Sequence, residues 1–542
     1  MRLLDVLSSA RIIRVLVYSS AVLFFFVLVF VPPLIGVLFK WDTLSQVFED
    51  PSLMNRALSA ILASFQIASL IAVIDLATGL PLAWFLARSK SKYMEILDTL
   101  VDMPLVMPTV ALGYSLLLFW GGPGGISILT GKGLIGPGWI LIAFLHLTFS
   151  YPYIVRTMVG AIKQYDVQYE MQARTLGASA FTTARTVTLP ILKLEIIASL
   201  ILAFARSLSE TGATVMVAGA FETGPVFIKR AIDLGYEGSL VFAGLIMIFL
   251  SILVLGMLRV LGARLELPLR RVFPRFEKKL SESRIHDTGM FLSILFFLLM
   301  IIVPSFFVIS PAIYAASDGT LEQAVRAVGL WRGYWDSFLL SFVVAGVVSI
   351  INVLLGLPMV IIVSRKKLGR FSTVLDALIN VPIIVPTVAL GVSLGLFWRE
   401  LSVLPIEEFW ILVLAHVSFT YPFFVKVMSA AVEGIDISLE DVARTLGARP
   451  FTVFRTLILP LTKYSLFSSI IMMFTRSIDE TGATLAVAVR LKTVPVLLVE
   501  WVSYAERGMI TLTQPALGAF ILILFSFAVM LISRMFLKAH MS

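Results

Sequence analysis

Long apolar stretches recur along the whole of this 542-residue chain, and they limit the folds open to it more than any other feature. A helix that crosses the hydrocarbon core of a bilayer needs roughly 20 predominantly apolar residues, and about twelve stretches meet that requirement. Hydrophobic residues make up 59% of the chain and charged residues only 14%. Because a water-soluble domain could not bury so much apolar surface, we expect an all-α polytopic membrane protein.

The predicted spans fall into two sets of six. The first set is Val15–Phe39, Ala57–Leu86, Pro104–Trp120, Ile140–Val155, Ile196–Val217 and Leu240–Leu258. The second set is Met290–Ile309, Phe338–Val363, Pro382–Trp398, Trp410–Val425, Leu466–Val487 and Ala516–Ile532. We therefore predict two six-helix repeats, residues 1–265 and 289–542, joined by a basic, solvated cytoplasmic linker at 266–288.

The two sets also share sequence. The recurring pairs are Pro108–Gly113 with Pro386–Gly391, His146–Pro152 with His416–Pro422, Ala173–Ala178 with Ala443–Ala448, and Arg206–Thr214 with Arg476–Thr484. Six spans in each repeat give both the same orientation, so a pseudo-two-fold axis along the membrane normal is expected. Many transporters place their pathway between such repeats.

The distribution of charge indicates topology. The net charge of +9 suggests nucleic acid at first, but most Lys and Arg fall in cytoplasmic segments if both termini face the cytoplasm, as the positive-inside rule requires. Arg365, Lys366 and Lys367 lie inside, for example, whereas Asp42 and Glu49 lie outside. We expect a multi-pass protein of the cytoplasmic membrane with the lipid bilayer, not nucleic acid, around it.

A patterned polar stretch separates the fourth and fifth spans in both repeats. Its residues are Glu170, Ala173, Gly177, Leu189 and Pro190 in the first copy, and Glu440, Asp441, Ala443, Gly447, Leu459 and Pro460 in the second. The glycines are suited to end a short helix, and the prolines to restart the chain toward the next span. The small alanines permit close approach of a partner. Ser438, with Asp441 three residues later, is typical of a helix N-cap.

This stretch resembles the cytoplasmic signature of binding-protein-dependent ABC importer permeases, Glu-Ala-Ala, three residues, Gly, nine residues, Ile-x-Leu-Pro. The spacing from Gly to Leu-Pro matches in both copies, while the opening triplets read Met171-Gln172-Ala173 and Asp441-Val442-Ala443. The resemblance implies a type I permease with both halves fused, two ATPase subunits docked at the two loops, and an extracytoplasmic solute-binding protein. Because only the second triplet is acidic, unequal docking of the ATPases is expected.

No nucleotide site is expected in the chain itself. A P-loop needs GxxxxGK followed by Ser or Thr, and Gly131-Lys132-Gly133 lacks both the upstream Gly and the hydroxyl residue. ATP and Mg²⁺ would therefore bind to the partner ATPase. We expect a transport subunit with no cofactor, metal or catalytic residue of its own rather than an enzyme.

Charged residues inside the fifth spans indicate a functional region, because each costs about 2.5–3.5 kcal/mol on insertion scales. Arg206 and Glu210, like Arg476 and Glu480, are spaced i, i+4. They form structural ion pairs, lie beside a pathway where Gly212 and Gly482 let the helix break and gate, or do both. The candidate pathway residues are Pro108, Thr109, Arg206, Glu210, Thr211, Gly212, Pro386, Thr387, Arg476, Glu480, Thr481 and Gly482.

Two further patterns have structural interpretations. Pro108 and Pro386 are predicted to kink the third spans. The chain has four His, and each repeated string holds only one, His146 or His416, which favours structural hydrogen bonding over a metal site.

The cargo is the least determined property. The Glu-Thr-Gly-Ala-Thr strings resemble the fifth helix of sulfate, molybdate and tungstate permeases, whereas the fused layout resembles ferric-iron and thiamine permeases. We expect an inorganic oxyanion, with ferric iron or thiamine as the alternative. An ion-coupled secondary transporter also fits two six-span halves, but it needs no patterned loop in both.

Overall fold

The computed structural model describes residues 2–89, 91–122, 124–264, 273–401 and 406–538, which contain helices and no strand. The first half comprises α1 (Arg2–Ser9), α2 (Arg11–Phe24), η1 (Phe25–Phe30), α3 (Val31–Ile35), η2 (Gly36–Leu44), α4 (Ser45–Phe48), α5 (Pro51–Arg88), α6 (Lys92–Val101), α7 (Met103–Val106), α8 (Thr109–Gly121), α9 (Ser127–Thr130), α10 (Trp139–Gln164), α11 (Gln168–Thr175), α12 (Ala180–Thr183), η3 (Ala184–Thr188), α13 (Leu189–Ile191), α14 (Lys193–Ser209), α15 (Gly212–Val217), α16 (Gly224–Leu234) and α17 (Glu237–Arg264).

The second half repeats this order. It comprises α18 (Pro274–Leu280), α19 (Ser283–Phe296), η4 (Phe297–Ile302), α20 (Val303–Phe306), α21 (Ile309–Tyr314), α22 (Thr320–Val325), α23 (Leu330–Ser364), α24 (Arg370–Ile379), α25 (Val381–Ile384), α26 (Thr387–Glu400), α27 (Glu408–Glu433), α28 (Ile437–Thr445), α29 (Pro450–Val453), η5 (Phe454–Ile458), α30 (Leu459–Asp479), α31 (Gly482–Val487), α32 (Val494–Glu506) and α33 (Thr513–Lys538).

The expected membrane spans are present as helices. Among the described residues, eight helices are long and apolar enough to cross a membrane, and three bent helix pairs raise the number to eleven. The apolar segment Thr513–Val529 of α33 adds a shorter one. Each predicted span coincides with one of these segments, which confirms the polytopic helical fold.

The third and fifth spans are more broken than the sequence suggested. Instead of a kink, the third spans turn by 106° and 105° just before α8 and α26. The physical reason is that a residue preceding proline avoids the helical region, and Met107 and Val385 have ψ angles of 133° and 132°. The fifth spans, predicted to continue to Val217 and Val487, end at Ser209 and Asp479, and a short helix follows each break.

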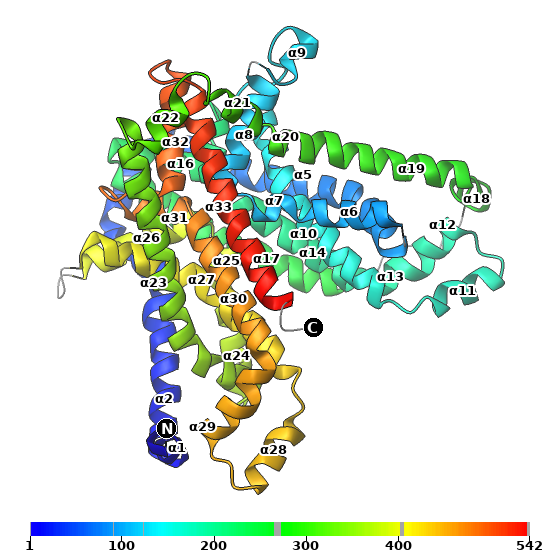
Figure 1. The fold of residues 1–542 in the computed structure, drawn as a ribbon, viewed down its shortest axis with the longest axis vertical. Helices are drawn as coiled ribbons and strands as arrows, with labels where there is room; N and C mark the ends of the chain where they lie inside the picture. Colours follow the sequence, from blue (N-terminus) through cyan, green and yellow to red (C-terminus); the bar gives the residue numbers. More distant parts are fainter. Residues whose placement is uncertain (1, 90, 123, 265–272, 402–405, 539–542) are drawn as a thin grey trace.

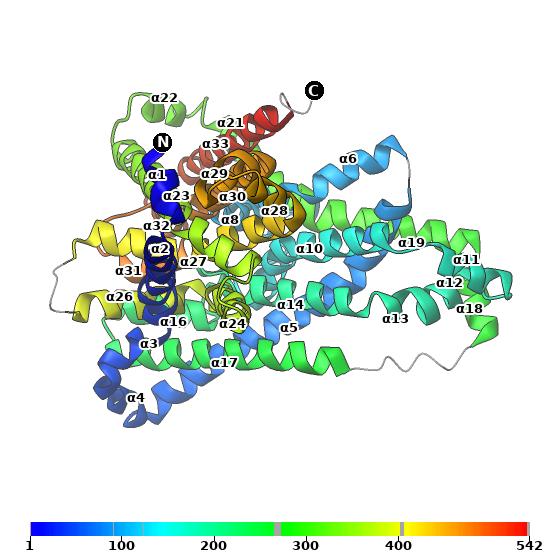
Figure 2. The ribbon, with the colours of Figure 1, turned by 90° about the horizontal axis from the view of Figure 1, so that it is seen from below.

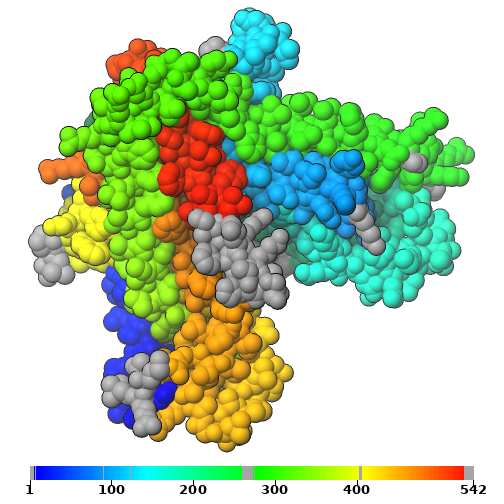
Figure 3. Space-filling view, in the orientation of Figure 1, coloured from blue at the N-terminus to red at the C-terminus, as the bar shows by residue number. Residues whose placement is uncertain are grey.

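The helices form two arms that diverge from a shared central region (Figure 1). One arm contains α10 and α12 to α14 and ends at α11, and the other contains α27, α29 and α30 and ends at α28. The space-filling view shows both arms as projections of the body (Figure 3). The two loops with the importer-like signature therefore occupy the tips of separate arms.

The first span of each half packs against the other half. The Val37 N–H donates to Ser393 Oγ at 3.1 Å, and the Ser393 hydroxyl donates to the Pro32 carbonyl at 2.9 Å. Ser115 makes the same two bonds, from the Val308 N–H at 2.8 Å and to the Pro304 carbonyl at 2.7 Å. Each of the two hydrophobic cores consequently contains residues from both sequence repeats.

A close backbone contact at Gly36 tests this exchange of first spans. A Cβ atom at Gly36 would lie 1.8 Å from the Ser393 carbonyl oxygen, whereas one at Gly244 would meet only ordinary contacts from 3.4 Å. We expect Gly36→Ala to lower the free energy of unfolding by about 1–3 kcal/mol, as overpacking does. Thermal unfolding in detergent would measure this, with Gly244→Ala as the control. Equal melting temperatures for the two variants would contradict the packing described.

Candidate functional site

The helices at the arm tips end in the same motif. Gly177 and Gly447 have left-handed φ angles of +92° and +86°. The Gly177 and Ala178 amides donate to the carbonyls of Arg174 and Ala173 at 3.0 and 3.1 Å, and the second copy repeats both bonds. These are the two hydrogen bonds of a Schellman motif. Glycine is therefore required by backbone conformation at both helix ends.

The glutamates of the signature face the arms rather than the solvent. Glu170 accepts hydrogen bonds from Arg88 at 2.6 Å and from Thr188 at 2.8 Å. Glu440 accepts one from Arg365 at 2.8 Å and one from Arg444 at 3.0 Å. Since Arg88 ends α5 and Arg365 follows α23, each glutamate joins an arm-tip helix to the second span of its own half.

The outward positions are occupied by apolar side chains that the sequence analysis did not single out. Leu176 and Leu446 are 89% and 83% exposed, and Met171 and Val442 are exposed beside them. Ala173 and Ala443 are only partly exposed, and Asp441 points outward near Arg444. The distinguishing signal was a leucine directly before each helix-ending glycine.

The predicted N-cap at Ser438 is wrong. Helix α28 begins at Ile437, and Asp436 caps it by accepting the Ser438 N–H at 2.9 Å. This hydrogen bond from the backbone lowers the pKa of Asp436. An aspartate two residues earlier in the chain is a better cap than a serine already inside the first turn.

The Leu-Pro pairs do not act alike. Leu189 and Pro190 lie in α13, and the chain then bends by 74° before α14. Leu459 and Pro460 begin α30 without such a bend, and residues Pro450–Asp479 form one continuous membrane-spanning helix. A π-helical turn, η3 or η5, precedes the pair in both halves.

Each arm tip is braced by a helix that precedes a first span. Asp5 in α1 accepts the Thr452 hydroxyl at 2.6 Å, and Ser8 accepts the Phe451 N–H at 3.2 Å. Helix α18 makes the equivalent contacts with α12, and Figure 2 shows α18 and α12 together at one arm tip and α1 and α29 at the other.

Glu277 is the centre of the α18 contact. It accepts the Thr182 hydroxyl at 2.6 Å and pairs with Arg185 at 2.7 Å, and the hydrogen bond from Thr182 is the main cause that lowers its pKa. The predicted linker at 266–288 is thus not solvated throughout, because Glu277 is buried. Its residues 266–272 lie outside the described residues.

The two halves meet where the fifth spans break. A Cβ atom at Gly212 would lie 2.5 Å from the Thr481 side chain, and one at Gly482 would lie 2.5 Å from Thr387 Oγ1. The cavity between them has a volume of about 10 Å³, which is room for about one water molecule. Its lining consists of Thr109, Ser209, Glu210, Thr211, Thr387, Arg476, Asp479, Glu480, Thr481 and Gly482. We refer to this junction as the gate, a label for its position between the halves, and its cavity leaves no room for a solute larger than water.

The charged residues at the gate form pairs and also cap helices. Arg206 lies 2.9 Å from Glu210, and Arg476 lies 3.3 Å from Glu480. Glu210 accepts the Ala213 N–H at 3.3 Å, and Glu480 accepts the Ala483 N–H at 3.0 Å. The ion pairs of one interpretation are therefore present, and they lie beside the junction of the halves, while the location of the pathway stays a prediction. Pro108 and Pro386 lie at the start of α8 and α26 beside the same junction.

The two histidines hold the breaks in shape. His146 Nδ1 lies 2.7 Å from Ser207 Oγ, before the break, and Nε2 lies 3.0 Å from Thr214 Oγ1, after it. His416 makes the same pair of contacts with Ser477 and Thr484 at 2.8 and 2.9 Å. Both ring nitrogens are thus engaged in hydrogen bonds, in agreement with the structural interpretation.

The gate is asymmetric at one position that the sequence analysis missed. Asp479 in the second half accepts the Thr109 N–H at 2.6 Å. Its counterpart Ser209 accepts the Thr387 hydroxyl through its carbonyl at 3.3 Å. The signal was visible in the matched strings RSLSETGAT and RSIDETGAT, where Ser209 and Asp479 differ in charge.

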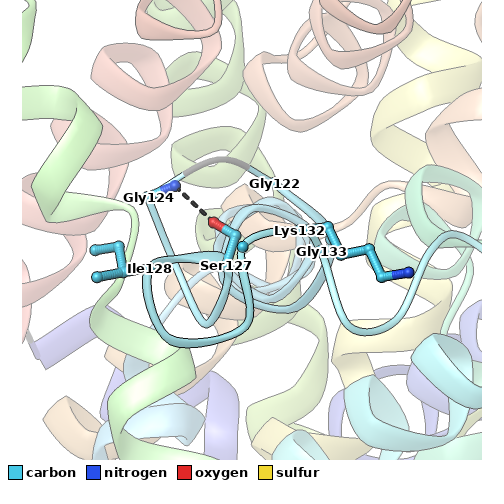
Figure 4. Close-up of a pocket in the computed structure, with 8 residues that line it drawn as sticks. Gly122, Gly124, Ser127, Ile128, Lys132 and Gly133 are labelled. Atoms are coloured by element: carbon cyan, nitrogen blue, oxygen red, sulfur yellow. Dashed lines mark hydrogen bonds between the residues drawn. The ribbon is translucent and has the colours of Figure 1, made fainter.

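A second cavity lies in the glycine-rich loop after α8, and it differs from the gate in volume and in lining residues. It has a volume of about 410 Å³ and is lined by Gly121, Gly122, Gly124, Ser127, Ile128, Gly131, Lys132 and Gly133. The Gly124 N–H donates to Ser127 Oγ at 3.0 Å, and Lys132 points away from that pair (Figure 4). Five of its eight lining residues are glycines, and Ser127, Ile128 and Lys132 supply the only side chains of the lining.

The described helices thus form a membrane protein of two tandem repeats, with two projecting arm tips and a tightly packed junction between the halves. A family model described as the binding-protein-dependent transport system inner membrane component matches residues 79–267 and again 353–541. The chain belongs to this family. It is the permease of an ABC importer with both halves fused in one chain.

The chain is similar to several curated permeases. It is 34% identical over 247 residues to the molybdenum transport system permease protein ModB of Mycobacterium tuberculosis, which covers 43% of this chain and 88% of that protein. It is 37% identical over 163 residues to ModB of Escherichia coli, 29% and 69% of the respective chains. The molybdate/tungstate transport system permease protein WtpB of Methanocaldococcus jannaschii is 29% identical over 250 residues, 45% and 97% of the chains.

We call the ion pairs Glu170–Arg88 and Glu440–Arg365 the glutamate anchors. Because they are buried to different extents, we expect the two arm tips to differ in how much the loss of an anchor loosens them. Glu440 and Arg365 are 4% and 5% exposed, whereas Glu170 and Arg88 are 16% and 27% exposed. Removing one partner of a buried pair typically costs about 3–5 kcal/mol, so Glu440→Gln should loosen α28 more than Glu170→Gln loosens α11. Trypsin cleavage after Arg444 and after Arg174 would report the two effects. Asp441→Asn, at an exposed residue, is the control, and a Glu440→Gln rate no faster than this control would refute the anchor.

Proposed function

We propose that this permease forms the translocation pathway for an inorganic oxyanion of the molybdate, tungstate or sulfate type. The proposal includes an ATPase under each arm tip, α11 and α28, which binds the ATP and Mg²⁺. It also includes an extracytoplasmic binding protein on the opposite face and both termini in the cytoplasm. The observation that carries it is the pairing of two exposed arm-tip helices with one closed gate between the halves.

The arm tips have the chemistry of docking surfaces. Leucines as exposed as Leu176 and Leu446 are costly in water and typical of sites that a partner covers. The Schellman turns and the anchors from Glu170 to Arg88 and from Glu440 to Arg365 hold these leucines on rigid elements. An ATPase that binds these leucines would therefore move the second span of each half as well as the fifth.

The route from arm tip to gate is short and continuous. In the first half, α12, η3 and α13 lead from α11 into α14, which ends at the gate. In the second half, the helical segment from α29 through α30 connects α28 to Asp479. Since packed elements move as rigid bodies about breaks, separation of the arms by the ATPases is expected to open or close the junction at Gly212 and Gly482.

Two observations support the proposed cargo: guanidinium groups close to the junction of the halves, and the names of the similar permeases. Arg476 lines the cavity at the junction of the halves, and Arg206 pairs with Glu210, another lining residue; guanidinium groups suit oxyanions. The named relatives carry molybdenum or tungsten oxyanion transport in their descriptions. The fused arrangement is the feature that favours the alternative, a ferric-iron or thiamine permease.

The docking surfaces can be tested by adding charge. We expect the double variant Leu176→Asp/Leu446→Asp to lose stable association with the ATPase, because a carboxylate would have to be desolvated in the interface. Co-purification of the ATPase with the membrane-inserted permease would measure this. Tyr93→Asp, at an exposed site outside both tips, is the matched control. Full co-purification of the double variant would exclude these leucines from the interface.

The cargo can be tested in proteoliposomes that contain the permease, the ATPase and the binding protein encoded beside it. We expect ATP-driven accumulation of molybdate, tungstate or sulfate, and none of thiamine or ferric iron. Accumulation of thiamine or iron alone would establish the alternative. Uptake that persists without any ATPase would overturn the importer mechanism itself.

A further inference from the structure

We propose that Asp479 is a one-sided latch that holds the two halves together at the gate. Asp479 ends α30 in the second half, and its Oδ1 accepts the N–H of Thr109 at 2.6 Å and the hydroxyl of Thr109 at 3.3 Å. Thr109 begins α8 in the first half. The inference rests on the proposed function only in taking this junction as the gate of transport.

The contact is strong because of where Thr109 lies. The first N–H groups of a helix have no partner within the helix, and the turn of 106° before α8 leaves the Thr109 amide in that position. A carboxylate placed there gains a charge-assisted hydrogen bond and a favourable interaction with the helix dipole. Asp479 therefore caps a helix that belongs to the other half.

The equivalent position of the first half has no such carboxylate. Ser209 directs its hydroxyl to the Arg206 carbonyl of its own helix at 3.0 Å. Thr387, the counterpart of Thr109, donates its hydroxyl to the Ser209 carbonyl at 3.3 Å. At these two equivalent positions of the gate, the halves are thus joined by the carboxylate of Asp479 on one side and by a neutral hydrogen bond to a carbonyl on the other.

The latch can release without leaving an isolated charge. Arg476 lies one turn earlier on the same helix, 3.5 Å from Asp479 and 3.3 Å from Glu480. When the halves separate, Thr109 moves away with α8, while Arg476 stays beside the carboxylate. The bond to Thr109 is therefore a contact that only the closed gate makes, and its loss does not leave Asp479 without a partner.

A distance measurement across the outer face tests the latch without the ATPase or cargo. The chain has no cysteine, so Tyr236→Cys and Met509→Cys place spin labels only on the exposed loops after α16 and α32. The full-length permease in lipid nanodiscs would be examined by pulsed electron paramagnetic resonance. With wild-type residues at the gate, we expect a predominantly short distance.

Two variants remove the latch from opposite sides. Asp479→Ser copies the first half, and Thr109→Pro deletes the donor N–H at the first position of a helix, where proline is tolerated. Either should raise the population of a longer distance by about tenfold, the factor that corresponds to loss of one charged hydrogen bond. Thr387→Pro, at the first position of α26, is the matched control and should have a much smaller effect.

The outcomes separate the latch from the transport function. Unchanged distances in both Asp479→Ser and Thr109→Pro would overturn the latch, and so would an equal effect of Thr387→Pro. Neither result alters the cargo and ATPase tests above, because labelled permease alone gives this readout. Distances are compared only between variants that elute as folded protein in size-exclusion chromatography.

Discussion

Inside a bilayer no water is available to a free backbone group, so each helix break must be satisfied by protein atoms. This chain interrupts four of its spans, and side chains satisfy backbone groups at three of the breaks, the two in the fifth spans and the one before α8. Glu210 and Glu480 cap the short helices after the breaks, and His146 and His416 hold both sides of them. Asp479 takes the amide at the start of α8. Because these polar groups satisfy the freed backbone groups, the helices can remain broken at this junction within the bilayer.

The architecture was predictable wherever it depends on local pattern. Apolar length located the spans, repeated strings revealed the tandem halves, and glycine located the ends of α11 and α28. The direction of Glu170 and Glu440 was not predictable, because their partners Arg88 and Arg365 lie in another span. The exchange of first spans was hidden for the same reason. Ser393 and Val37 are far apart in sequence, and no local periodicity encodes their contact.

The size of the bends and the position of the helix cap could not be predicted from the sequence for a different reason. Proline at 108 and 386 indicated a kink, but whether a helix bends slightly or turns by more than 100° is decided by neighbours that satisfy the freed groups. At α28, Ser438 and Asp436 were both acceptable caps by residue type. The start of the helix, which chooses between them, is fixed by packing of the arm rather than by the local string.

Fusion of the halves has allowed them to diverge where symmetry would be costly. The anchor at Glu440 is more deeply buried than the one at Glu170, and only the first half bends after its Leu-Pro pair. At the gate, a symmetric chain would place two latching carboxylates next to Glu210 and Glu480. A single one leaves the junction with fewer carboxylates, since Asp479 has Ser209 as its counterpart.

The exchange of first spans has a consequence for biogenesis. Val37 is bound by Ser393, 356 residues further along the chain, and ribosomes add about 5–20 residues per second. The first span thus waits in the membrane for tens of seconds before the helix that completes its packing is made. During that interval the first span packs against α17 of its own half, so only the face that α26 will cover is left to lipid or to the insertion machinery. Assembly of the two halves is therefore a late event, completed only when most of the chain has left the ribosome.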